Sequence, residues 1–159
     1  MSQGRALRDI VGFTGVVLSL AFVGWEIRQN TQVARAQTRV ELTALNNDFL
    51  ETIGSNPEFA ELWRRAWTLD EELDESQMFR VELVMLQYLR LLENVHLQYQ
   101  EGLIDQDALN SYGFFGFRET FMVHPRFPAI WQPRRVSFDP EFVSFLEDPD
   151  RAVAGSRAF

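Results

Sequence analysis

The sequence contains no cysteine and only two histidines in 159 residues. Without cysteine, the chain cannot form disulfides, use a thiol nucleophile or bind a metal through thiolates. Two histidines leave few side chains for acid–base or covalent catalysis. The sequence also lacks a glycine-rich phosphate loop, a His-Glu-x-x-His motif and a recognisable Ser/His/Asp set. These absences predict a protein that is not an enzyme and that has no cofactor.

Lysine is absent as well, so all 15 basic residues are arginines, which we attribute to genome base composition. The net charge is −8 at pH 7. An acidic chain argues against nucleic acid as a partner, because phosphate binding needs clustered cationic side chains. No alternating strand pattern, internal repeat or low-complexity tract is present. The sequence therefore predicts an all-α protein, and its length suits one domain with an appendage.

A long uncharged run occupies residues 10–25, IVGFTGVVLSLAFVGW. As a helix it would be roughly 24 Å long, somewhat shorter than a hydrocarbon core of about 30 Å. Arg5, Arg8 and Arg28 can extend their charged ends to the headgroups, and Trp25 suits the interface. We therefore expect a single transmembrane helix with lipid around it.

Other interpretations of this run stay open. A cleaved signal peptide would use the basic residues before the run and a small-x-small site at Ser19-Leu20-Ala21. A helix buried in a soluble domain is a second alternative. The run is apolar on every face, whereas a helix at a domain surface has a polar side. This argues against the buried helix and against a helix lying in the membrane plane.

Small residues recur along one side of the run, at Gly12, Gly15 and Ser19. Such a face allows a second membrane helix to approach closely, although glycine is common in spanning helices generally. Because the sequence has no second apolar run, a packing partner would belong to another chain. The arginines after the run, Arg28, Arg35 and Arg39, favour a single-pass topology with the C-terminal domain in the cytoplasm.

The rest of the chain is divided by helix starts and stops. The expected transmembrane helix, which we call the anchor, should continue as an amphipathic helix to about residue 53 and end at Gly54. Asn56 and Pro57 predict the start of a short helix. Asp74 and Gln77 form a capping-box pattern before a helix that ends at Gly102.

After Asp105 we expect another helix, to about residue 123. Prolines at positions 125, 128, 133, 140 and 149 exclude long helices beyond that point. One brief helix is predicted at Asp139-Pro140-Glu141. The predicted architecture is a membrane anchor (residues 1–28), a helical bundle with an irregular Pro/Phe-rich C-terminal part (residues 29–148) and a tail (residues 149–159).

Two features of the helix expected between Asp74 and Gly102 suggest functional sites. Glu93 and His96 form a Glu-x-x-His motif. A di-metal site in a helical bundle needs two such motifs and two further glutamates. This sequence has one copy of the motif, because the other histidine, His124, has no glutamate three residues before it. Arg90 and Glu93 lie on an otherwise apolar line and can pair. They are expected to be either an internal ion pair or the edge of a partner surface.

Aromatic residues are concentrated in the C-terminal part of the sequence. Three interpretations of them are open: a core, a contact with a protein or a membrane surface, and a pocket for a flat apolar ligand. The residues singled out as interface candidates are Phe114, Phe117, Phe121, Phe127 and Trp131. A core is the ordinary role of such a cluster.

The stretch from Val16 to Thr31, ending in Glu-Ile-Arg-Gln-Asn-Thr, resembles the opening of a group of bacterial proteins without an assigned activity. Arg90, Glu93-Asn94, Gln98-Tyr99 and Gly102-Leu103 are similar to that group too. The resemblance covers residues 10–146 and implies one hydrophobic helix followed by a small helical domain. It implies no catalytic residues.

Together these patterns predict a non-catalytic, membrane-anchored accessory or scaffold subunit of a larger membrane protein complex, of the kind found in respiratory or photosynthetic assemblies. Its partners would be lipid and other membrane subunits. The alternatives are a metal-dependent enzyme built on Glu93 and His96, and a sensor that binds an apolar ligand.

Overall fold

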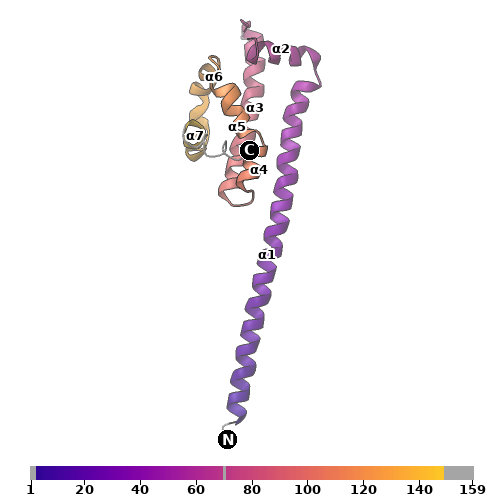
Figure 1. The fold of residues 1–159 in the computed structure, drawn as a ribbon, viewed down its shortest axis with the longest axis vertical. Coiled ribbons are helices and arrows are strands. Elements are labelled where there is room, and N and C mark those ends of the chain that lie inside the picture. Colours follow the sequence, from indigo (N-terminus) through magenta and orange to yellow (C-terminus); the bar gives the residue numbers. More distant parts are fainter. Residues whose placement is uncertain (1–2, 70, 149–159) are drawn as a thin grey trace. The chain divides into compact units, whose positions relative to one another are not determined.

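The computed structural model describes residues 3–69 and 71–148, and for residues 3–12 and 115 it describes the backbone alone. The protein is all-helical, as expected, and no strand occurs in the described residues (Figure 1). The elements in chain order are α1 (Gln3–Gly54), α2 (Pro57–Trp67), α3 (Glu75–Gln100), α4 (Gln106–Ser111), α5 (Phe114–Phe117), the π-helix η1 (Arg118–Met122), α6 (Phe127–Arg134), the 3-10 helix η2 (Arg135–Ser137) and α7 (Pro140–Glu147).

The chain forms two compact units, Met1–Gln37 and Thr38–Phe159. The described part of the first unit is the start of α1. Among the residues whose side chains are described, no helix combines the length and apolarity needed to cross a membrane. The spanning helix expected at residues 10–25 is therefore not supported, and its first three residues lie outside the described side chains.

Helix α1 confirms the expectation that the apolar run continues without a break into an amphipathic stretch ending at Gly54. In the second unit, its buried side faces α3. Leu42 is 1% exposed, and the ring of Phe49 stacks on Tyr88 with centroids 4.4 Å apart. Stacked aromatic pairs add about 0.5–1.5 kcal/mol to the burial of their area.

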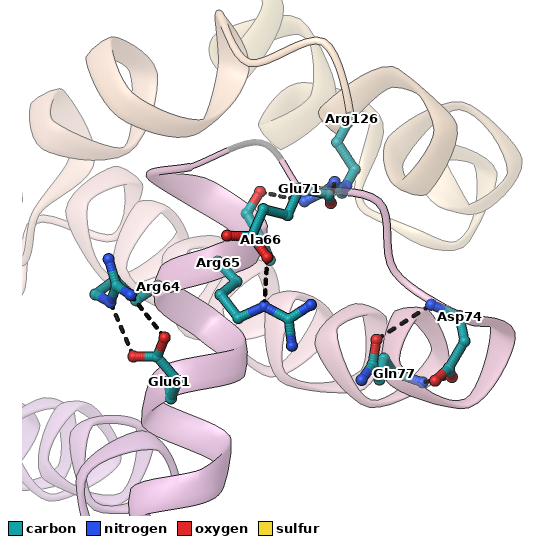
Figure 2. A network of polar contacts seen from close by, with 8 residues as sticks. All are labelled: Glu61, Arg64, Arg65, Ala66, Glu71, Asp74, Gln77 and Arg126. Atoms are coloured by element: carbon teal, nitrogen blue, oxygen red, sulfur yellow. Dashed lines mark hydrogen bonds and ion pairs between the residues drawn. The ribbon is translucent and has the colours of Figure 1, made fainter.

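Helices α2 and α3 begin where the capping residues predict. The Asn56 side chain accepts a hydrogen bond from the Phe59 N–H at 3.0 Å, and Pro57 is the first helical residue. At α3, Asp74 accepts from the Gln77 N–H while the Gln77 side chain accepts from the Asp74 N–H, as Figure 2 shows. The capping box is confirmed, and such caps contribute about 1 kcal/mol each.

Helix α3 supplies the largest part of the core. Its buried side chains recur about every three or four residues, so they form one stripe along the helix. The stripe consists of Val81, Met85, Tyr88, Leu89, Leu92 and Val95. Each large apolar side chain buried in this way stabilises the fold by about 1.5–3 kcal/mol.

The prediction of one continuous helix from residue 106 to about residue 123 was wrong. Asp105 does cap α4, by accepting from the Ala108 N–H at 2.9 Å. The helix ends at Ser111, however, and Gly113 has a φ of +88°, a conformation that interrupts an α-helix and favours glycine. The chain resumes as the short α5 and then widens into η1.

Two arginines complete the proline-rich C-terminal part by binding backbone carbonyls. Arg118 donates to the carbonyls of Phe145, Leu146 and Asp148 at the end of α7. Burial of this guanidinium lowers the pKa of Arg118 from its ordinary value. Carbonyls at a helix C-terminus lack partners within the helix, and a cation there is favourable.

Arg126 acts similarly at α2, where it donates to the carbonyls of Ala66 and Glu71 (Figure 2). The Glu71 side chain in turn accepts from Arg65 Nε at 2.6 Å. The link between α2 and α3 is therefore held by a residue that lies 60 positions after Ala66.

Gly113 gives a test of this packing. A Cβ at Gly113 would lie 2.8 Å from the Tyr88 hydroxyl oxygen, whereas one at Gly102, with a φ of +71°, would meet nothing within 4 Å. We expect Gly113→Ala to lower the free energy of unfolding by about 2 kcal/mol or more, and Gly102→Ala by about 1 kcal/mol. Urea denaturation measures both.

Adding Tyr88→Phe removes the hydroxyl, so the cost of Gly113→Ala should become smaller in that background. Equal costs in the two backgrounds, or equal costs for the two glycines, would contradict the close approach of Tyr88 to Gly113.

Candidate functional site

Arg90 and Glu93, predicted as a pair, lie in contact on α3. Arg90 Nη1 donates to Glu93 Oε2 at 2.7 Å. Arg90 Nη2 donates to the carbonyl and the hydroxyl of Ser137 at 3.1 and 3.2 Å, and the guanidinium lies 4.0 Å from the centre of the Phe138 ring. The second oxygen, Glu93 Oε1, accepts from the Asp139 N–H at 2.7 Å. The pair therefore joins α3 to the segment between η2 and α7.

This network borders a hollow of about 300 Å³ between α3 and α7. Its lining combines apolar and polar side chains. The lining residues are Arg90, Glu93, Asn94, His96, Leu97, Gln100, Asp139 and Phe142. Many of the polar groups are already engaged: Asp139 caps α7 by accepting from the N–H groups of Glu141 and Phe142, and Gln100 donates to Glu141. The hollow is thus bordered by side chains that hold α3 and α7 together.

His96 of the Glu-x-x-His motif is 3% exposed and belongs to the core. Its ring lies 4.4 Å from the Phe145 ring and 5.9 Å from the Phe142 ring. Among the residues whose side chains are described, no group of three or more histidines and carboxylates could hold a metal ion. The arrangement offers Glu93 as an ion-pair partner of Arg90 and His96 as a side chain packed against aromatics.

The C-terminal aromatics form one connected cluster inside the second unit. Phe114, Phe117, Phe127 and Trp131 are buried, and Phe121 is partly buried. They pack on rings from α2 and α3: Phe117 contacts Tyr88 at 5.3 Å, and Phe121 contacts Trp67 at 5.0 Å. Trp131 Nε1 donates to Glu147 Oε1 at 2.8 Å. These five side chains are therefore placed in the core rather than on a surface.

Two polar groups are buried in this cluster. Burial raises the pKa of the Tyr88 phenol, whose hydroxyl faces the Gly113 carbonyl at 3.5 Å. Trp67 Nε1 is buried without a hydrogen-bond partner among the described residues. Its ring meets the His124 ring edge-on at 5.1 Å, so the indole lies in an aromatic environment.

The predicted helix-packing face is described only in part. Gly12 lies outside the residues whose side chains are described. A Cβ on Gly15 would meet nothing within 4 Å, and the Ser19 hydroxyl donates to the Gly15 carbonyl at 2.9 Å. The apolar side chains around this face are exposed, among them Phe13, Val16, Leu18, Leu20 and Phe22.

Sequence reasoning did not find Ser137, Phe138 or Asp139 as partners of Arg90 and Glu93, because 47 and 46 positions separate the bonded pairs. It also did not find Arg118 and Arg126 as capping residues. One signal was available: short helices between prolines leave several carbonyls without partners, and an arginine inside such a segment can satisfy them.

Comparison of the chain with protein-family models, with curated proteins and with solved structures gave no match. The resemblance to the bacterial group with one hydrophobic helix stays a prediction.

The role of Glu93 can be measured. Glu93→Ala leaves the Asp139 N–H without its acceptor and Arg90 without its carboxylate, so we expect the free energy of unfolding to fall by about 1–2 kcal/mol. Glu93→Gln retains an acceptor oxygen and should cost less. Glu101→Ala, at an exposed residue for which no side-chain bond is found, is the control. If Glu93→Ala behaves like Glu101→Ala in urea denaturation, the network does not stabilise the fold.

Proposed function

We propose that this protein is a non-catalytic accessory or scaffold subunit, held at a membrane by the first part of α1 and bound there to other membrane proteins. The observation that carries the proposal is the apolar surface of α1 in the first unit. Its large apolar side chains are 47% to 72% exposed, and they occur on all sides of the helix.

Such a surface is unfavourable in water. Monomeric soluble proteins rarely leave contiguous apolar patches of more than a few hundred Å² uncovered. The exposed residues from Phe13 to Ile27 are Phe13, Val16, Val17, Leu18, Leu20, Phe22, Val23, Trp25 and Ile27. In the sequence, the uncharged run begins earlier, at Ile10 and Val11. Lipid hydrocarbon, with neighbouring membrane helices, is the environment that suits side chains on every face.

The distribution of charge supports the same placement. Residues 1–37 contain four arginines and two acidic residues, whereas residues 38–159 contain eleven arginines and twenty-one acidic residues. Cations flanking an apolar helix favour contact with anionic headgroups. An acidic body is soluble and is repelled by the same headgroups. The second unit is thus suited to protein contacts in the aqueous phase, which is why we assign it the scaffold role.

The non-catalytic part of the proposal comes from the chemistry of the side chains. The chain has no cysteine, and its two histidines both lie against aromatic rings. The polar groups near Arg90 hold α3 to α7, so they are needed for structure. We therefore favour binding over catalysis.

The anchor is tested by flotation of the full chain with phosphatidylcholine vesicles that contain a fraction of phosphatidylglycerol. The unmodified protein should float with the vesicles. Leu18→Asp places a charge near the middle of the apolar run, which costs about 3 kcal/mol and should reduce binding about 100-fold. Val40→Asp introduces the same charge at an equally exposed apolar residue of α1 in the second unit, and should leave binding unchanged.

The anchor proposal fails if the unmodified chain stays with the soluble fraction, or if the two aspartate variants lose binding equally. Circular dichroism verifies that both variants remain helical, as expected for changes at exposed positions.

The accessory role is tested by extracting the protein from its native membrane in a mild detergent. We expect it to migrate in a particle larger than two 18.5 kDa chains with their detergent. Migration as a single chain or as a pair of identical chains would count against a larger complex.

A further inference from the structure

Helix α3 has an apolar ridge on the side that faces away from the core. Phe79 is 57% exposed, Leu83 is 48% exposed and Leu86 is partly buried. These residues and Ser76 are spaced by three, four and three positions, so they fall on one line along the helix. Arg134 bonds to Glu82 of α3, and Ser137 bonds to Arg90 of α3. Val136, between them in sequence, is 88% exposed. Phe79 and Leu83 are about half exposed, whereas Leu86 packs partly against the core.

Hollows lie on both sides of the ridge. One, of about 550 Å³, is lined by Glu75, Ser76, Met78, Phe79 and Glu82. The other, of about 250 Å³, is lined by Thr52, Asn56, Phe59, Arg80, Leu83 and Val84. A ridge flanked by hollows is complementary in shape to another ridge of the same form.

Glu75 and Arg80 place opposite charges on the two sides of the ridge. Glu82 lies on the side of Glu75, where it is paired with Arg134 at 2.9 Å, and the uncharged Gln87 lies on the side of Arg80. The ridge can be written as a coiled-coil heptad, abcdefg, with Ser76 and Leu83 at position a and with Phe79 and Leu86 at position d. In this register Glu75 occupies position g, and Arg80, five residues later, occupies position e. In a parallel pair of identical helices, g of one helix faces that e residue of its neighbour. Both Glu75–Arg80 contacts of such a pair would therefore be attractive, whereas an antiparallel pair would bring like charges together.

From the ridge, the hollows and these charges we infer that α3 is the dimerisation surface of this protein, and that its occupant is the same surface of a second copy in parallel orientation. The contact covers residues 75–87, about two heptads. It ends there because Arg90 and Glu93, the next a and d residues, are bonded to Ser137 and Asp139.

The parallel arrangement is compatible with the anchor proposed above, although the interface does not depend on it. Within the second unit, α1 runs opposite to α3, since Thr52 lies beside Leu83 and Val84 while Phe49 stacks on Tyr88 (Figure 1). A twofold axis along α3 therefore leaves the second-unit part of α1 in both copies running in the same direction.

The absence of cysteine permits a direct test on the full chain in mild detergent. Leu83 lies on the proposed axis, where a and d residues of paired helices approach closely enough for a disulfide. We expect Leu83→Cys to form a disulfide-linked dimer on mild oxidation, several-fold more than Val123→Cys. Val123 is the matched control because it is 74% exposed and follows Phe121, which packs on the buried side of α3.

Charge variants in the Leu83→Cys background test the orientation. Arg80→Glu turns both intermolecular contacts repulsive and should weaken association about tenfold. Combining it with Glu75→Arg restores opposite charges across the pair and should restore the dimer. Both residues are exposed, and the Arg80 guanidinium lies 5.2 Å from the centre of the Phe59 ring, so urea denaturation and circular dichroism control for the loss of that contact.

Equal dimer yields for Leu83→Cys and Val123→Cys would overturn the inference, as would a failure of the double charge swap to recover what Arg80→Glu loses. The vesicle flotation described above reads out the anchor separately. Efficient dimerisation without flotation rejects only the anchor, and flotation without dimerisation rejects only this interface.

Discussion

The buried stripe of α3 is the surface on which the second unit is built. Tyr88 in the middle of this stripe contacts Phe49 of α1, Phe117 of α5 and Phe121 of η1, so one side chain connects α1 with the consecutive elements α5 and η1, far away in sequence. Apart from α1, the helices that pack there are short and could not be stable alone, since isolated helices of fewer than about 12 residues are marginal in water. Their order therefore depends on burial against α3.

Burial alone would leave the ends of these short helices unsatisfied, and this is where the arginines contribute. Arg118 binds the carbonyls that end α7, and Arg126 binds a carbonyl in the last turn of α2. The planar guanidinium presents five donors, so one side chain can satisfy several carbonyls at once, which an ammonium group does with less geometric definition. A chain whose cations are all arginines is well suited to a fold with many helix ends.

Local patterns predicted the fold well where the interactions are local. Asn56, Asp74 and Asp105 each cap a helix by bonding to a backbone N–H three residues later, and the sequence identifies such residues without any tertiary information. The break at Gly113 was missed because a helical pattern of apolar residues continues across it. What decides the break is the left-handed glycine and the approach of Tyr88 from α3.

The surroundings of Arg90 and Glu93 show the same limit. Their spacing predicts a pair, but the bonds to Ser137 and Asp139 depend on how α7 packs, which no local pattern encodes. The aromatic cluster was open to three interpretations in the sequence for the same reason. Apolar composition identifies residues that avoid water, and only the packing of α5, η1 and α6 against α3 determines that they meet one another rather than a ligand or a partner.

The two exposed apolar surfaces, the first part of α1 and the outer ridge of α3, differ in a way that supports the different environments proposed for them. On α1 the apolar side chains cover all sides of the helix, which a single protein contact could not bury. On α3 they form a narrow line bordered by opposite charges, and a line of this width is what a neighbouring helix covers. Two heptads make a weak interface in dilute solution. Confinement of both copies to one bilayer would raise their effective concentration, so the anchor would make a weak α3 contact sufficient.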